Sequence, residues 1–396
     1  MRIVIAPDSM KGSLRADEVA AALAAGVHRV DPHIACHLIP LSDGGEGFTA
    51  ALAPAMAARI VHTSVTNPLG EPWPAAFAIC ERPTGRLALI ETAQAVGLDR
   101  LDNAKLDILT ATSYGLGELI GAALDHGARD ILIGLGGSAT NDGGAGMLAA
   151  LGAKFYDAHG APLQVRPHDL RACRTIDLTD LDSRLANVRI RAACDVTNAL
   201  LGPAGAAATF APQKGASQPE VADLEAMLTA LCHARVIGAT VELGSQLPRC
   251  AATPGAGAAG GIGWALCAFL RASAEAGITL VSEILGLASA IAGADVVFTA
   301  EGAIDAQSAM GKVIGGLAQL CARYDRPLIA FGGRIEPEAA ALYDAGVSAL
   351  MPIVTRPSTP AQARNHARAN LTAAAEAITR ILRIAPPGDN EHKIAL

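Results

Sequence analysis

Short apolar runs alternate along this chain with longer stretches in which Ala and Leu recur at helical spacing. The strand-like runs lie at residues 2–9, 36–47, 87–93, 130–137, 173–180, 188–198, 294–305, 326–333 and 347–354. Most of these runs are followed by a helix-length segment, beginning with a helix expected over roughly 15–29. This alternation is typical of an α/β fold with a largely parallel sheet.

The middle of the chain has a different pattern from its two ends. Residues 61–80 alternate like a β-hairpin around the turn sequence NPLGEP. We therefore expect residues 1–62 and 290–383 to form one doubly wound domain and residues 63–289 to form a second α/β domain inserted into it. Residues 384–396 carry no periodic pattern and are expected to be a mobile tail.

Composition narrows the class of protein. The chain has 396 residues, of which 51% are hydrophobic and 17% charged, with a net charge of −7. These values disfavour a disordered protein or one that coats a nucleic acid. The eight cysteines form no C-x-x-C pair, Met1 leads directly into a strand without a signal sequence, and the apolar run 251–270 contains a proline and five glycines. We expect a cytoplasmic enzyme with no nucleic-acid or membrane partner.

A glycine-rich stretch, GGSATNDGGAG at 136–146, follows the apolar run at 130–135 and precedes a helical pattern. Such a strand-to-helix turn presents free N–H groups to an anion. The alternative is a tight connection whose polar residues only cap the helix. Residues 43–47 and 142–146 share the pattern D-G-G-x-G, so the same kind of turn is expected twice.

Two other nucleotide-binding motifs, the dinucleotide fingerprint and the Walker A loop, have glycine-rich turns of a similar kind. Gly134, Gly136 and Ala139 fit a loosened dinucleotide fingerprint, and Asp157 follows at the spacing of its ribose-binding acid, as in an NAD(P)-dependent dehydrogenase. That interpretation leaves Asn141 and Asp142 without a role. A Walker A loop is absent, because the sequence around 306–313 lacks its first glycine and its hydroxyl residue.

Charged residues recur in loops that follow apolar strands. Lysines stand in glycine-flanked loops at Lys11, Lys214 and Lys312, and carboxylates follow strands at Asp8, Asp43, Glu46, Asp142, Asp195, Glu301 and Asp305. Any one of them could be a solvated lysine or a helix cap. Together they indicate a shared acidic site for a metal and a proton acceptor, with cations for phosphate, as phosphoryl transfer requires.

Six motifs in this order resemble the bacterial glycerate kinase family. They are IAPDSMKGSLRADEVA, PLSDGGEGF, GLGGSATNDGGAGML, DVTNALLGPAGAAATFAPQKGA, PGAGAAGGIG and TAEGAIDAQSAMGK, spread over residues 3–312. The resemblance implies a flavodoxin-like domain with an inserted α/β domain, and transfer of phosphate from ATP with Mg²⁺ to D-glycerate, forming 2-phosphoglycerate. Ala300 and Met10 depart from the usual Gly and Phe, but neither removes a charge.

The resemblance also implies roles for the residues in these motifs, at a site in the cleft between the two domains. Nucleotide binding is expected from Gly136, Gly137, Ser138, Thr140, Asn141 and Lys214, and substrate binding from Ser9, Lys11 and Ser13. Asp195, or else Asp43 or Asp305, would hold Mg²⁺ or take the hydroxyl proton. Lys312 and Lys214 would neutralise the charge that develops during phosphoryl transfer. The other carboxylates expected at the site are Asp8, Glu46, Asp142 and Glu301.

Several alternatives stay open at this point. The chain could instead be a dehydrogenase of a small hydroxy acid, a kinase of another hydroxy acid such as tartronate, or an acid-binding protein without catalysis. Motif spacing does not determine which glycerate hydroxyl is phosphorylated. Oligomeric state is open as well, with a homodimer as one candidate.

Overall fold

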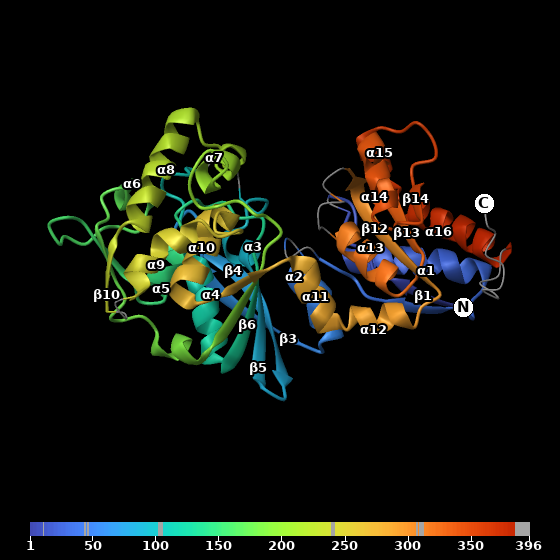
Figure 1. Cartoon of the computed structure of the whole chain (residues 1–396), viewed down its shortest axis with the longest axis horizontal. Coiled ribbons are helices and arrows are strands. Elements are labelled where there is room, and N and C mark those ends of the chain that lie inside the picture. Colours follow the sequence, from blue (N-terminus) through green and yellow to red (C-terminus); the bar gives the residue numbers. More distant parts are fainter. Residues whose placement is uncertain are drawn as a thin grey trace. The chain divides into compact units, whose positions relative to one another are not determined.

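The computed structural model describes residues 1–10, 12–42, 45, 47–101, 106–238, 242–305, 308 and 313–384. The chain forms two compact units, one from Met1–Asp43 with Ile278–Leu396 and the other from Gly44–Gly277 (Figure 1). The first unit is therefore built from both ends of the chain, and the second is inserted into it.

The first unit contains a five-stranded sheet in which every strand is parallel to its neighbours. Its order is β14-β13-β12-β1-β2, with β1 at Arg2–Ile5, β2 at Ala35–Leu38, β12 at Val296–Ile304, β13 at Leu328–Ile335 and β14 at Ala349–Pro352. Numbered within this unit, the order is 2-1-3-4-5, which is that of the flavodoxin-like fold. The predicted fold class is confirmed.

Helices of the first unit cover this sheet. They are α1 (Ala16–Val30), α11 (Gly277–Leu285), α12 (Leu287–Ala292), α13 (Val313–Arg323), α14 (Ala341–Asp344), α15 (Pro360–Asn365) and α16 (Ala367–Ile384). Ile3, Ile5 and Phe298 pack with Leu23 of α1 and Leu371 of α16 in one buried cluster. Val4 and Val297 alternate with these strand residues and are also fully buried, so both faces of the sheet are covered.

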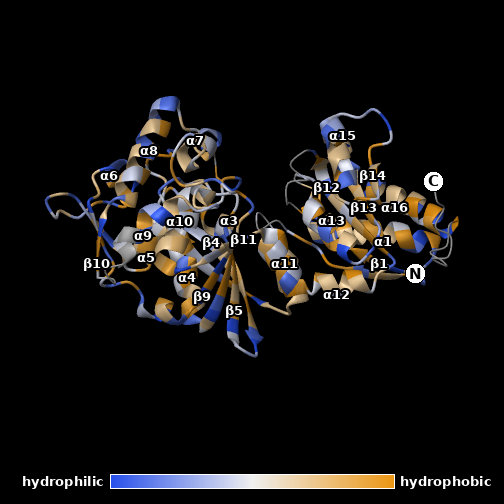
Figure 2. Ribbon diagram, viewed as in Figure 1, coloured by the Kyte–Doolittle hydropathy of each residue, from blue (hydrophilic) through white to orange (hydrophobic). Residues whose placement is uncertain are grey.

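The second unit contains a six-stranded mixed sheet of order β11-β9-β6-β5-β4-β3. Its strands are β3 (Arg59–Thr66), β4 (Pro72–Arg82), β5 (Gly85–Glu91), β6 (Ala128–Gly134), β9 (Arg189–Ala193) and β11 (Ser273–Glu275). The pairs β3–β4 and β4–β5 are antiparallel, whereas β5, β6, β9 and β11 are parallel. Figure 2 shows apolar residues along these strands and polar residues at the hairpin ends.

Around this sheet the second unit places its helices and a small three-stranded sheet. The helices are α2 (Phe48–Ala55), α3 (Thr92–Val96), α4 (Tyr114–Asp125), α5 (Ala145–Ala150), α6 (Pro167–Leu170), α7 (Ala206–Phe210), α8 (Gln218–Cys232), α9 (Glu242–Ala251) and α10 (Ala258–Leu270). The small sheet has the order β10-β8-β7, from Arg235–Ile237, Thr175–Asp177 and Lys154–Tyr156.

The strand predictions agree closely with these elements, and the hairpin expected at 61–80 is formed by β3 and β4. The second unit spans Gly44–Gly277, whereas the expected boundaries lie near 63 and 290. Because β3 begins at Arg59 and pairs along its whole length with β4, residues 59–62 belong to the sheet of the second unit. The expected tail at 384–396 lies, apart from Ile384, outside the described residues.

Two further observations concern the thiols and the helices. All eight cysteines are free thiols. None of the described helices is both long and apolar enough to cross a membrane.

Candidate active site

The glycine-rich stretch connects β6 to α5 and is held from inside by Asp142. One carboxylate oxygen of this fully buried residue accepts the N–H and hydroxyl of Ser113, at 2.7 and 2.8 Å, and the N–H of Gly146 at 3.1 Å. The other accepts the N–H of Gly144 at 3.0 Å. Burial raises the pKa of Asp142, and the hydrogen bonds from Ser113, Gly146 and Gly144 act in the opposite direction.

Lys214 holds the same stretch from the other side. It ends the short 3₁₀ helix Pro212–Lys214, and its ammonium group donates to Ser138 Oγ at 3.0 Å and to the carbonyl oxygen of Thr140 at 2.7 Å. The side chain is only 4% exposed, and this burial lowers its pKa to about 7 although the charge of Asp142 opposes the shift. The loop is therefore a rigid structure built on two buried ionisable groups.

Only the first part of the loop faces outward. Gly137 is exposed and has a φ of +64°, a conformation that favours glycine. Among the described residues, the N–H groups of Gly136 and Gly137 have no hydrogen-bond partner. By contrast, the N–H groups at the start of the six-residue helix α5 are used by Asp142 and by Ser113 Oγ, which accepts from Met147. An anion would therefore meet the loop at Gly136 and Gly137.

Gly45, from the first D-G-G-x-G sequence, packs against the start of the glycine-rich stretch. It lies so close to Gly136 that a Cβ atom on Gly136 would be 2.7 Å from the Cα atom of Gly45. The stretch 255–261 packs on the other side: a Cβ on Gly260 would be 2.0 Å from the carbonyl oxygen of Thr140. Glycine is required at Gly136 and Gly260 by these close approaches of backbone to backbone.

Glu91 is a buried carboxylate near the glycine-rich stretch that the sequence motifs did not indicate. It is the last residue of β5, is only 4% exposed, and accepts the N–H groups of Gly47 at 3.0 Å and Thr49 at 3.3 Å. These groups belong to the first turn of α2, where a negative charge is favourable. The sequence signal for it was present, since a carboxylate directly after the apolar run LALI is unusual in a buried strand.

The glycine-rich stretch and Glu91 lie at the same edge of the six-stranded sheet, because the strands β5, β6, β9 and β11 run parallel and end there. Asp195 follows β9 at this edge and accepts the N–H of Gly277 at 2.8 Å. Several buried polar atoms there have no hydrogen-bond partner in the described part of the chain: the hydroxyls of Thr92 and Thr140 and both amide atoms of Asn141. Unsatisfied buried polar atoms of this kind indicate sites for water or a ligand.

The first unit brings acidic residues together where its strand order reverses, between β1 and β12. Asp8 follows β1 and donates its N–H to the carbonyl oxygen of Ala300 at 3.0 Å, next to Glu301. In open α/β sheets this switch point is where ligands bind. Ala300 itself is an ordinary strand residue with no positive φ, so the departure from glycine causes no strain.

Hydroxyl groups complete the arrangement in this unit. Ser308, a buried residue that the sequence analysis did not single out, donates its hydroxyl to Glu301 Oε2 at 2.9 Å and its N–H to Asp305 Oδ1 at 3.3 Å. The N–H of Ser9 donates to Asp8 Oδ1 at 2.6 Å, and the Ser13 hydroxyl donates to the carbonyl oxygen of Arg364 at 3.0 Å. Glu301 and Asp305 are thus held side by side through Ser308.

Four predicted site residues, Lys11, Asp43, Glu46 and Lys312, lie outside the described residues. Within the described ranges, no three His, Cys, Asp or Glu side chains are grouped in a way that could hold a metal ion.

The dinucleotide interpretation does not fit the structure. Asp157 follows β7, which belongs to the small sheet and is not a neighbour of β6. Its carboxylate accepts the N–H groups of His159 and Ala161, at 2.8 and 2.9 Å, and so closes a local exposed turn. A ribose-binding acid must instead follow the strand next to the glycine loop.

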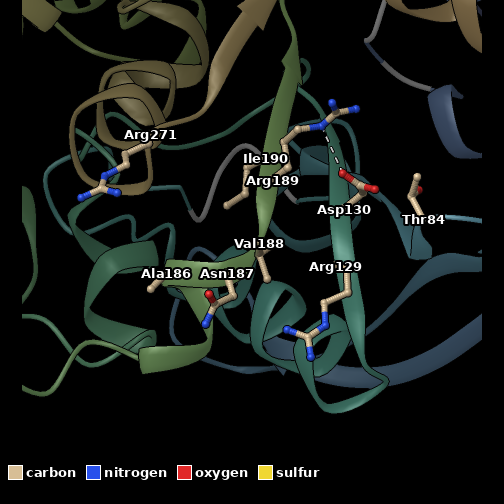
Figure 3. Close-up of a pocket in the computed structure, with 9 residues that line it drawn as sticks. All are labelled: Thr84, Arg129, Asp130, Ala186, Asn187, Val188, Arg189, Ile190 and Arg271. Carbon is tan, nitrogen blue, oxygen red and sulfur yellow. Dashed lines mark ion pairs between the residues drawn. The ribbon is translucent and has the colours of Figure 1, made fainter.

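A separate hollow of about 680 Å³ lies at the opposite end of the parallel strands (Figure 3). It is lined by Arg129, Arg189 and Arg271, and the guanidinium group of Arg189 pairs with Asp130 at 3.1 Å. Arg129 and Arg189 stand at the starts of β6 and β9, whereas the glycine-rich loop follows the end of β6. This hollow is therefore not part of the candidate active site.

Comparison with known proteins agrees with the motifs. The model of the glycerate kinase family matches residues 3–383. A glycerate kinase of Bacillus subtilis and a glycerate 2-kinase of Escherichia coli are each 42% identical to the chain, covering 97% of it and 98% of their own length. A crystal structure of a glycerate kinase 2 from Salmonella typhimurium LT2 is 41% identical, covers 97% of this chain and 98% of its own, and superposes with a TM-score of 0.83. With its fold, its glycine-rich loop and these relatives in agreement, the chain belongs to the glycerate kinase family.

Proposed function

We propose that this protein is a glycerate 2-kinase, which transfers the γ-phosphoryl group of ATP to the 2-hydroxyl of D-glycerate. The observation that carries the proposal is the rigid glycine-rich loop at 136–142, which leaves the N–H groups of Gly136 and Gly137 open at the carboxyl edge of a parallel sheet. The identity of the substrates is inferred from membership of the glycerate kinase family.

In the second unit, the N–H groups of Gly136 and Gly137 and the hydroxyl of Ser138 would bind phosphate oxygens of ATP. Lys214 directs that hydroxyl and compensates phosphate charge. Thr140, Asn141 and Asp142 are buried, so their role in this proposal is to shape the loop. Asp142 in particular is occupied by four donors and would not take a proton from the substrate.

In the first unit, the polar groups at the β1–β12 switch point would bind D-glycerate. Lys11 and the hydroxyl of Ser9 would hold its carboxylate. Ser13 has no donor left for it, because its N–H and hydroxyl donate to the carbonyl oxygens of Met10 and Arg364. During transfer the 2-hydroxyl oxygen bonds to the γ-phosphorus, the bond to the ADP oxygen breaks, and the hydroxyl proton must leave. Asp8 directly precedes Ser9 in the sequence, and its carboxylate would accept that proton. Asp305 is the second candidate.

Magnesium ion fits the donors present, because carboxylate oxygens are the ligands it prefers, and one or two of them suffice when phosphates supply the rest. Asp195, or Asp305 beside Glu301, would hold it. When bound, the ion would neutralise phosphate charge.

The proposal is tested by ADP release from the purified protein with ATP and Mg²⁺. We expect release that depends on D-glycerate, is much slower with tartronate, and stops when EDTA removes divalent ions. Release that is equally fast with tartronate would assign another hydroxy acid as substrate. No release with any acceptor, together with binding of NAD(P)H detected by fluorescence, would overturn the proposal in favour of a dehydrogenase.

A further inference from the structure

Glu91 has a position that the proposed reaction does not yet explain. It is a buried carboxylate at the end of β5, at the same edge of the sheet as the glycine-rich loop that follows β6. Burying a carboxylate costs free energy unless hydrogen bonds compensate it. Among the described residues, the backbone N–H groups of Gly47 and Thr49, 44 and 42 residues away in the sequence, contribute to this compensation.

The contacts of Gly47 and Gly45 connect Glu91 with the nucleotide loop. Gly47 has a φ of +85°, a conformation that favours glycine, and caps the N-terminus of α2, where its N–H group donates to the carboxylate of Glu91. Two residues earlier, Gly45 touches Gly136 so closely that no side chain would fit between them. Gly47 and Thr49 are therefore held by Glu91, and Gly45 lies against Gly136.

We infer that Glu91 is a positioning residue for phosphoryl transfer, which holds Gly47 and Thr49 in place and so keeps Gly45 against the phosphate-binding part of the glycine-rich loop. The inference deepens the proposed function and rests on it. Gln at position 91 has nearly the same volume but replaces one accepting oxygen by an N–H₂ group that faces an N–H donor. One of the hydrogen bonds from Gly47 and Thr49 would then be lost. A displacement of about 1 Å at a phosphate-binding loop costs on the order of 100-fold in rate.

The decisive comparison uses Glu91→Gln and Glu118→Gln. Glu118 on α4 is the control, since it is a partly buried glutamate that also accepts a backbone N–H, that of Thr66, and has no hydrogen bond to the described residues of either loop. For Glu91→Gln we expect kcat with D-glycerate and ATP to fall about 100-fold, with KM for D-glycerate changed less than threefold. Glu118→Gln is expected to change thermal stability little, because the one hydrogen bond that Glu118 accepts in the described part of the chain can go to the oxygen that glutamine retains, and to keep kcat within a factor of three.

A second variant reaches the same segment from the other side. Gly136→Ala retains Glu91 but places a methyl group 2.7 Å from the Cα atom of Gly45, so it is expected to lower kcat in the same way. Hydrogen exchange of peptides covering Gly47 and Thr49 adds a readout that does not depend on activity. Exchange there should be faster in Glu91→Gln and unchanged in Glu118→Gln.

The outcomes separate the two proposals. Wild-type protein that is active, with Glu91→Gln equally active or losing activity only in proportion to its stability, would overturn the role of Glu91 and leave the kinase assignment intact. Unchanged exchange at Gly47 and Thr49 would overturn it as well. Wild-type protein that shows no glycerate-dependent ADP release would refute the kinase assignment instead, and with it the catalytic meaning of this anchor.

Discussion

At the scale of single residues, two buried ionisable groups determine the shape of the glycine-rich loop. Asp142 accepts four hydrogen bonds from three residues, Ser113, Gly144 and Gly146, and Lys214 donates to a hydroxyl and a carbonyl of the same loop. Loss of one partner in such a network leaves buried polar groups unsatisfied, which costs more than the bonds themselves contribute.

Asp142→Asn is expected to destabilise the protein by about 2–4 kcal/mol, because an amide N–H₂ group would face backbone and hydroxyl donors. The matched control is Asp157→Asn. Both hydrogen bonds to Asp157 go to Oδ1 in an exposed turn, and asparagine retains that oxygen, so a change within about 0.5 kcal/mol is expected. Urea unfolding measures the free energy of unfolding of both variants. Equal losses of stability in the two would contradict the structural role given to Asp142.

The lowered pKa of Lys214 predicts that the stability of the folded protein depends on pH. Its pKa of about 7 in the folded protein lies below the value of about 10.4 in an unfolded chain, so the unfolded state binds one more proton between these values. The free energy of unfolding of the wild type, relative to Lys214→Met, should therefore rise by up to about 1.4 kcal/mol per pH unit from pH 7 towards pH 10. A relative stability that is constant from pH 6 to 10 would show that Lys214 keeps its ordinary pKa.

At the scale of elements, close packing of backbone explains several glycines that the sequence alone leaves ambiguous. Gly26 of α1 faces α16, where a Cβ atom would be 2.3 Å from the carbonyl oxygen of Thr372. The Thr372 hydroxyl in turn donates to the carbonyl oxygen of Ala22 at 3.0 Å. Gly121 of α4, by contrast, has no atom within 4 Å of such a Cβ.

The two glycines therefore predict opposite effects of the same substitution. Gly26→Ala should destabilise the protein by about 2 kcal/mol or more, since backbone atoms of α16 would have to move. Gly121→Ala should stabilise it by up to about 1 kcal/mol, which is the difference in helix propensity. Thermal unfolding of both variants tests the packing of α1 on α16, and a stabilised Gly26→Ala variant would contradict it.

The elements themselves were largely predictable, whereas their contacts were not. Strands such as β1 and β12 are short apolar runs bounded by polar residues, a pattern that the sequence displays directly. The importance of Glu91 and Ser308 was missed, because their partners are distant in the sequence or carry no recognisable motif. The sequence likewise grouped Asp142 with the reactive carboxylates, since spacing does not reveal that backbone donors surround it.

At the scale of the whole molecule, the chain consists of two units, each with its own buried core. Both tryptophans of the chain, Trp73 and Trp264, belong to the second unit. Tryptophan fluorescence therefore reports the unfolding of the unit that carries the glycine-rich loop, while circular dichroism reports both units.

A non-hydrolysable ATP analogue with Mg²⁺ should consequently raise the fluorescence-detected midpoint of urea unfolding. At a free concentration of 100 times Kd the expected stabilisation is about 2.7 kcal/mol. Gly137→Ala, which forces a side chain into a φ of +64° at the exposed part of the loop, should weaken this shift. A shift seen only by circular dichroism, with the fluorescence midpoint unchanged, would place the nucleotide on the other unit.

The central claim, a kinase that phosphorylates the 2-hydroxyl of D-glycerate, is tested most directly by identifying the product. The purified protein is incubated with D-glycerate, ATP and Mg²⁺, and the product is coupled to enolase with and without phosphoglycerate mutase. We expect full signal with enolase alone, because enolase acts on 2-phosphoglycerate. Signal that appears only when the mutase is added would show transfer to the 3-hydroxyl and would contradict the claim.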